Sequence, residues 1–151
     1  MAHVDLSLSG LQTHGPDRVL GGFLGSLDLW SYAVNVANEP CLLIDKVGVV
    51  LAASPGCGQL FDIDAREAVG RRLVDGVLHL LDFNVVSGEL PGWEVDKIPP
   101  RLATTTGGLA RGLMRVRGPG GAPNTVDAIS VPLRDADAVV GSLTFFALVA
   151  R

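Results

Sequence analysis

The first third of the chain has the apolar spacing of one helix followed by two strands. Between Phe23 and Asn38 an apolar residue recurs every three or four positions: Leu24, Leu27, Trp30, Val34 and Ala37. This spacing lines one face of a helix, which ends before Pro40 because the residue preceding a proline is pushed out of the helical region. Two short apolar runs follow at 41–45 and 49–53. A turn at 45–48 joins them, so we expect a tight hairpin.

The middle of the chain predicts short helices joined by loops. Ser54 and Asp64 are suited to begin helices, because their side-chain oxygens can accept hydrogen bonds from the unpaired N–H groups of a first turn. Pro55 is favourable at the first helical position. A further helical turn or two is expected within 71–81, and another helix within 93–106, interrupted by its two adjacent prolines.

The last third predicts three strands in an antiparallel meander, at 109–117, 125–133 and 139–149. The order of helix, two strands, short helices and three strands is typical of an α+β domain with its helices grouped on one side of the sheet. We expect a flexible arm at 1–22, a flanking helix at 23–38 and one domain at 39–151.

Several turns and segments resemble those of the PAS domain family. The shared features are an apolar strand ending in Asp, a glycine turn, a proline-led helix after the second strand, a Gly-Arg-Arg-Leu segment and a closing hairpin. The matching positions are 42–45, Gly48, Ser54-Pro55, Gly70-Arg71-Arg72-Leu73 and 131–141. The resemblance implies a five-stranded antiparallel sheet in the order 2-1-5-4-3 with short helices on one face. It also implies a sensory, ligand-binding or dimerising role in a signalling protein, acting on an effector domain or a separate partner.

The final strand is apolar on both of its faces. One face carries Leu143, Phe145, Ala147 and Val149, and the other carries Val140, Phe146 and Leu148 together with Ser142 and Thr144. An antiparallel strand with one solvated face should alternate, so the outer face of the sheet is expected to be covered. The helix at 23–38 is the expected cover, from the same chain or from a partner's. We therefore predict a homodimer formed through Leu24, Leu27, Trp30, Val34, Phe146 and Leu148.

The inner face of the sheet would then line a ligand pocket or fill the core. Its expected apolar residues are Leu43, Leu51, Phe61, Leu73, Leu102, Met114, Val116 and Phe145. Ligand sites combine apolar walls with a few placed polar groups, and the sequence offers no obvious polar anchor. Pocket and plain core both remain open at this point.

The resemblance does not support a flavin photoadduct or a haem. Relatives that form a flavin adduct carry a reactive cysteine on the helix after the Gly70 segment, and 71–75 contains no cysteine. Relatives that bind haem supply a histidine from the long helix, and 93–106 contains no histidine. His79 is the nearest candidate ligand, and an ordinary surface or core role is the simpler interpretation. The identity of any cofactor stays open.

The resemblance also implies a possible anion site, since extracytoplasmic relatives bind carboxylic acids through basic residues in the pocket, and three arginines on one predicted strand are the candidates here. Arg111, Arg115 and Arg117 share one face of the strand, while the opposite face is the better candidate for a pocket wall. The arginines then most simply face solvent or a partner. Arg115 or Arg117 is expected to pair across strands with Asp127.

Composition narrows the function classes. The chain has 151 residues, 48% apolar residues and a net charge of −4, which favours a globular domain and disfavours binding to nucleic acid. The longest apolar stretch, 138–150, is shorter than the roughly 18 residues of a membrane span. No secretory signal is recognisable at the N-terminus, and the two cysteines predict reduced thiols. We therefore expect a cytoplasmic protein that acts away from nucleic acid and membranes.

An enzymatic role is the least supported interpretation. Two pairs of aspartates, Asp62 with Asp64 and Asp135 with Asp137, stand in turns and helix caps, where aspartate is common for local hydrogen bonding. No serine or threonine has an adjacent histidine to act as a base. The leading hypothesis is a PAS-type sensory or dimerisation domain. A ligand-free interaction scaffold of the same fold is the second, and a small α+β enzyme is the third.

Overall fold

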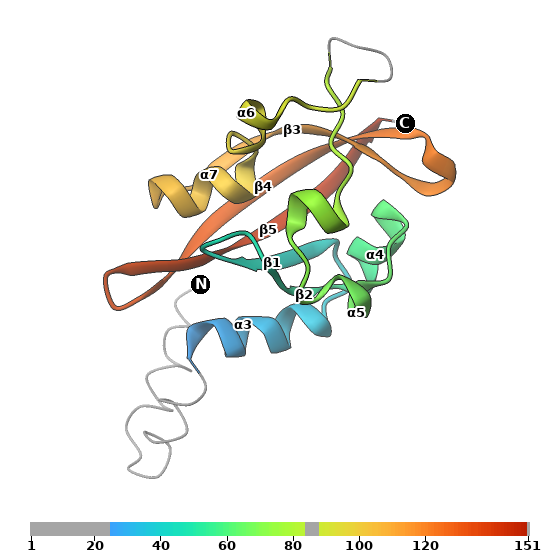
Figure 1. The fold of residues 1–151 in the computed structure, drawn as a ribbon. Coiled ribbons are helices and arrows are strands. Elements are labelled where there is room, and N and C mark those ends of the chain that lie inside the picture. Colours follow the sequence, from blue (N-terminus) through green and yellow to red (C-terminus); the bar gives the residue numbers. More distant parts are fainter. Residues whose placement is uncertain (1–24, 84–87, 151) are drawn as a thin grey trace.

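Five antiparallel strands form one sheet in the order β2-β1-β5-β4-β3 (Figure 1). In the computed structural model, which describes residues 25–83 and 88–150, the strands are β1 (Cys41–Asp45), β2 (Val50–Ala53), β3 (Ala110–Arg117), β4 (Pro123–Asp135) and β5 (Ala138–Ala150). The predicted α+β class and strand order are confirmed. The expected arm at 1–22 and Leu24 lie outside the described residues.

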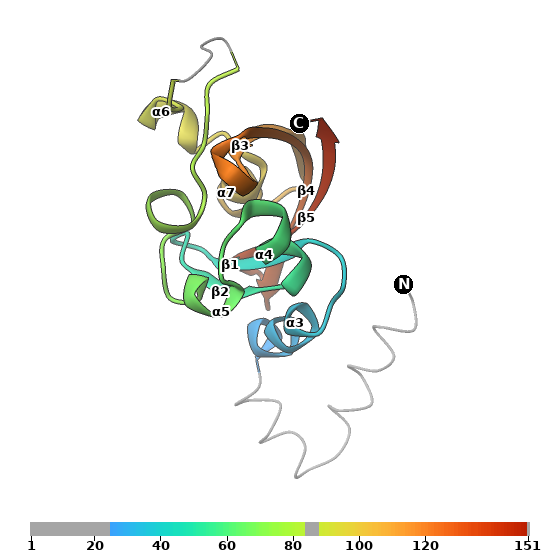
Figure 2. The ribbon, with the colours of Figure 1, turned by 90° about the vertical axis from the view of Figure 1, so that its right-hand side faces the viewer.

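Short helices connect these strands. They are α3 (Ser26–Asn35), α4 (Pro55–Phe61), α5 (Ala65–Ala68), the π-helical turn η1 (Leu73–Val77), α6 (Gly92–Val95), α7 (Pro99–Thr106) and the 3-10 turn η2 (Pro119–Gly121). Figure 2 shows α3 against β1 and β2 on one side of the sheet, with α6 and α7 on the other. The helical turn or two predicted within 71–81 is the turn η1, and the helix predicted at 93–106 is divided into α6 and α7.

The local signals for helix starts act as predicted. The Ser54 hydroxyl accepts hydrogen bonds from the N–H groups of Cys57 (3.1 Å) and Cys41 (3.0 Å), and it donates to the Glu39 carbonyl at 2.7 Å. It therefore caps α4 and ties that helix to β1. The Asp64 carboxylate accepts from the first-turn N–H groups of α5. The prolines at 99 and 100 begin α7 instead of interrupting a helix, because proline loses no hydrogen bond in a first turn.

The sheet separates two apolar clusters. The inner cluster lies between the sheet and the helices α4, α5, η1 and α7, and it includes Leu42, Ile44, Val50, Phe61, Leu73, Val116 and Phe146. The outer cluster lies under α3 and includes Val34, Cys41, Leu43, Ala52, Leu133 and Leu143. Because both faces of β1 are packed, this strand and its neighbours carry apolar residues on both sides. The predicted cover of the outer face by the N-terminal helix is confirmed for the part of the sheet that α3 contacts.

Candidate functional site

Two phenylalanines that are adjacent in β5 point to opposite faces of the sheet. Phe146 is 4% exposed and lies in the inner cluster, where its ring meets Phe61 edge to face with centroids 4.9 Å apart. Phe145 is 44% exposed and lies on the outer face, opposite Ile129 of β4. The prediction that Phe145 lines the interior and Phe146 an interface is therefore wrong.

Buried hydroxyls explain this reversal. Ser142 and Thr144 share the face of Phe146, and both are fully buried. The Ser142 hydroxyl donates to the Pro100 carbonyl of α7 at 2.9 Å, and the Thr144 hydroxyl bonds to that of Ser130 at 2.6 Å. Polar residues on a strand usually mark its solvated face, but here each hydroxyl has a partner inside the protein, so its burial carries little penalty.

The other predicted pocket residues divide between the two faces. Phe61, Leu73, Met114 and Val116 lie in the inner cluster, as expected. Leu43 and Leu51 pack against the outer cluster under α3 instead, so the prediction that they face inward is wrong. A β-bulge between Leu43 and Ile44 changes the pairing register with β2. The apolar pattern of these short strands could not reveal it.

A groove of about 200 Å³ lies between the segment at 80–83, the helices α6 and α7, and β3. Its apolar lining includes two predicted pocket residues, Leu102 and Met114, together with Phe83, Leu90, Ile98 and Leu113. Leu102 is partly exposed and Met114 is buried. The groove is also lined by Glu94, Lys97, Arg111 and Arg115. This combination of apolar and charged side chains in one lining suits a small amphipathic ligand.

The arginines of β3 do not converge on a shared anion. Arg111 holds the Asp127 carboxylate through two hydrogen bonds, at 2.6 and 3.2 Å, and these bonds lower the pKa of that carboxyl. The Arg115 guanidinium instead donates to the Asp82 carbonyl at 3.3 Å. Asp127 pairs with Leu113 in the sheet, so Arg111 and Arg115 are both diagonal neighbours of it. The prediction that Arg115 or Arg117 pairs with Asp127 is therefore wrong. Arg115 bonds to the segment at 79–82, which pairs with the edge of β3, and the Arg117 guanidinium donates to the Gly121 carbonyl at 3.5 Å.

The outer face of the sheet is only partly covered. Three residues of the α3 stripe, Leu27, Trp30 and Val34, pack on the chain's own outer cluster. Beyond α3, the outer face exposes an apolar strip on β3, β4 and β5, which consists of Leu113 (55% exposed), Ile129 (36%), Phe145 (44%) and Val149 (57%). We call these four residues the outer strip. The predicted interface residues Val34 and Phe146 are buried inside the chain, and Leu148 is partly exposed.

The two cysteines are buried and are not suited to react as nucleophiles. Both are buried and unpaired, and burial raises the pKa of the Cys57 thiol to about 12. Such a thiol stays protonated near neutral pH and is a poor nucleophile. Among residues 25–83 and 88–150, no three His, Cys, Asp or Glu side chains are grouped so that they could hold a metal ion. No helix in the described part of the chain is long and apolar enough to cross a bilayer.

Solved structures with a similar fold include PAS and light-oxygen-voltage domains. A PAS domain from Colwellia psychrerythraea superposes with a TM-score of 0.59 at 18% identity, over 83% of this chain and 98% of that one. The PAS domain of the fruit-fly ELK potassium channel superposes with a TM-score of 0.63 at 14% sequence identity. The superposition covers 84% of this chain and 99% of that one. A light-oxygen-voltage domain studied with a flavin analogue superposes with a TM-score of 0.61 at 20% sequence identity. The superposition covers 84% of this chain and 90% of that one. No protein-family model matches the sequence, and no curated protein matches it.

Proposed function

We propose that this chain, which has the PAS fold, is a sensory or regulatory domain that acts by binding and not by catalysis. The fold is shared with domains of that kind, including the PAS domain of a potassium channel and that of a two-component sensor histidine kinase. The observation that carries the proposal is the outer strip, an apolar surface that the chain's own helix leaves uncovered. We place this function in the cytoplasm, with an effector domain or a separate signalling protein as the partner that receives the signal.

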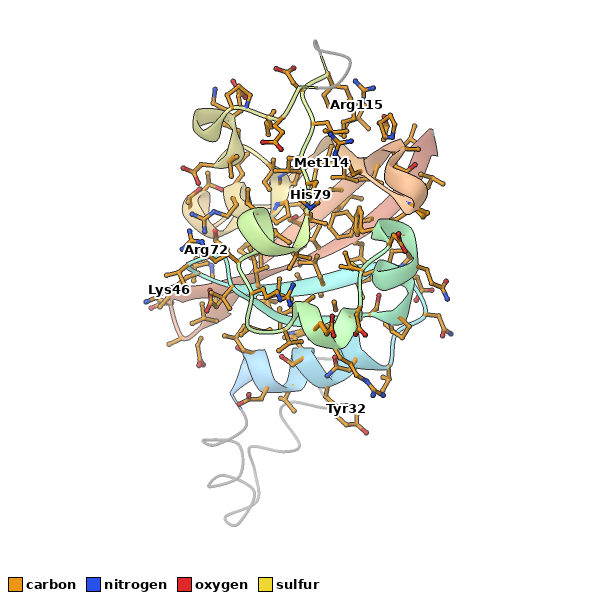
Figure 3. All side chains as sticks on the ribbon, turned by 45° about the vertical axis from the view of Figure 1, so that its right-hand side comes forward. Tyr32, Lys46, Arg72, His79, Met114 and Arg115 are labelled. Atoms are coloured by element: carbon orange, nitrogen blue, oxygen red, sulfur yellow. The ribbon has the colours of Figure 1, made fainter. Side chains whose placement is uncertain are left out.

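The occupant that we propose for the outer strip is a second copy of the chain. The four side chains of the strip lie on three adjacent strands of the outer face, the face that α3 covers in part. This helix carries a further exposed residue, Tyr32, and its C-cap residue Val36 is exposed as well. In Figure 3 the Tyr32 side chain extends away from the body of the protein. Exposed apolar surface of this kind marks an interaction site, and pairing two copies would remove both strips from water.

Sedimentation velocity across micromolar concentrations tests this dimer. We expect the wild-type chain to form a dimer and Phe145→Glu to be monomeric with an unchanged far-ultraviolet circular dichroism spectrum, because a charge would be buried at the interface. Val47→Glu is the matched control, since Val47 is similarly exposed but lies in the turn between β1 and β2 and belongs neither to the strip nor to α3. A wild-type monomer at all concentrations, or a Phe145→Glu variant that remains dimeric, would contradict the proposed interface.

The groove beside β3 supports a second function, the binding of a small ligand. Its lining combines apolar side chains, including Met114 and Leu102, with charged ones. Native mass spectrometry of freshly purified protein tests this idea. A retained molecule that is lost from Leu102→Trp, which would fill the groove, supports a sensor. A mass equal to that of the bare chain supports the alternative of a ligand-free scaffold.

A further inference from the structure

A second pocket, of about 210 Å³, shares no lining residue with the groove. The turn between β1 and β2 forms one wall with Val47 and Gly48, and the beginning of η1 contributes Arg72. The opposite wall comes from α6 and α7 and includes Asp96 and Arg101. Three segments that are distant in the sequence thus bring two guanidinium groups to one small cavity.

Arg101 is the unusual residue of this pocket. Its side chain is 19% exposed, and its Nη2 atom lies 3.4 Å from a carboxylate oxygen of Asp96. Its Nη1 atom is buried and has no hydrogen-bond partner among the described residues. A buried donor without an acceptor costs about 1–3 kcal/mol, and more when it is charged. Such a group calls for a partner that the protein itself does not supply.

Gly48 allows the guanidinium to take this position. Its φ of +92° is a conformation that other residues rarely adopt, and a Cβ there would lie 2.9 Å from Nη1 of Arg101. The Gly48 carbonyl accepts from the Leu73 N–H at 2.9 Å, and it makes no hydrogen bond to Nη1. The close approach therefore places the guanidinium against the turn without satisfying it.

Arg72 is held beside the same turn by the backbone. It pairs with Val49 in an isolated bridge, and the next residue along bonds to Gly48. Figure 3 shows Arg72 on the same flank as Lys46, which belongs to the turn. The pocket lining therefore holds two positive side chains and one negative, Asp96, which is 70% exposed and can neutralise Arg101 only weakly.

We propose that this pocket binds a small oxyanion, namely the carboxylate or phosphate group of a metabolite. Guanidinium groups match the geometry of such anions and bind them through paired hydrogen bonds. The size of the pocket agrees with this class, because about 210 Å³ is below the roughly 300–1,000 Å³ typical of sites for drug-sized ligands. The three valines that complete the lining, Val47, Val74 and Val95, would contact a short apolar part of the same molecule. This site does not depend on the function proposed for the groove or the outer strip.

Isothermal titration with inorganic phosphate and with citrate, at constant ionic strength, tests the proposal and separates the two sources of the anion. We expect saturable binding of at least one of them to the wild-type chain. Arg101→Gln should weaken it roughly ten- to hundredfold, the value of a hydrogen bond to a charged group. Asp96→Asn should tighten binding, because it removes the competing carboxylate. Arg66→Gln is the matched control, since it removes one exposed arginine on α5 and should leave the affinity unchanged.

A chloride-only titration gives the background, and the amide resonance of Gly48 in a two-dimensional NMR spectrum gives a local readout. If Arg101→Gln does not fold, Arg72→Gln replaces it, because Arg72 is exposed and its substitution should be tolerated. Saturable binding that depends on either arginine and shifts the Gly48 resonance supports the site. Absence of binding by the folded wild-type chain, or equal binding by all variants, overturns it.

Discussion

Truncating the adjacent phenylalanines of β5 one at a time tests the assignment of the two sheet faces. Phe146 is 4% exposed and touches Phe61. Burying a phenylalanine removes about 200 Å² from water, which is worth about 5 kcal/mol at about 25 cal/mol/Å². Part of this is retained by alanine, while a cavity and a lost aromatic contact add to the cost, so Phe146→Ala should lower the free energy of unfolding by about 3–5 kcal/mol.

Phe145→Ala should cost much less in the monomer. With 44% of the side chain in water, we expect at most about 2 kcal/mol. Urea unfolding followed by circular dichroism gives both values. If Phe146→Ala is too unstable to measure, Phe146→Leu replaces it, with an expected loss in the free energy of unfolding of about 1.5 kcal/mol or less. The measurement is repeated at several protein concentrations, because a dimer would make the effect of Phe145→Ala grow with concentration. If Phe145→Ala is as costly as Phe146→Ala at the lowest concentration, our placement of the two rings is refuted.

Three further predictions concern the cap, the thiol and the ion pair. Ser54→Ala should lower the free energy of unfolding by about 1–3 kcal/mol in urea melts, because it removes a helix cap and leaves the buried Cys41 N–H unpaired; an unchanged value would show that water replaces the hydroxyl. For Cys57, burial raises the pKa from 9.0 to about 12. The folded state thus favours the neutral thiol, and this contribution to stability is complete below pH 9 and is lost as the pH rises toward 12. Cys57→Ala should therefore reduce the fall in the free energy of unfolding between pH 9 and pH 12. Equal falls in the wild-type and variant proteins would argue against the raised pKa of Cys57. For Asp127, Arg111 lowers the carboxyl pKa, so the stability that their pairing contributes is present above the ordinary carboxyl pKa and is lost as the pH falls through the lowered one. Asp127→Asn should therefore reduce the acid dependence of the urea midpoint, and an NMR titration of Asp127 with an ordinary pKa would exclude the pairing.

The sequence by itself determined the order of the elements and where several of them begin. Apolar spacing located α3 and all five strands to within a few residues, since spacing and local turn chemistry act over short stretches of chain. Ser54 and Asp64 begin α4 and α5 as predicted, because a cap bonds mainly to N–H groups two or three residues away. The resemblance of the turns to PAS domains supplied the strand order, which the structure confirms.

Only the tertiary structure decided which side of each strand faces the helices. Phe145 and Phe146 are both apolar, so alternation alone could not choose between them. The choice depends on Ser142 and Thr144 finding partners in α7 and β4. The same is true of the proposed anion pocket, because Gly48 and Arg101 meet through the packing of α7 beside the β1–β2 turn. The apolar pattern of a strand is a local property of the sequence, whereas the partners that permit a side chain to be buried come from distant segments.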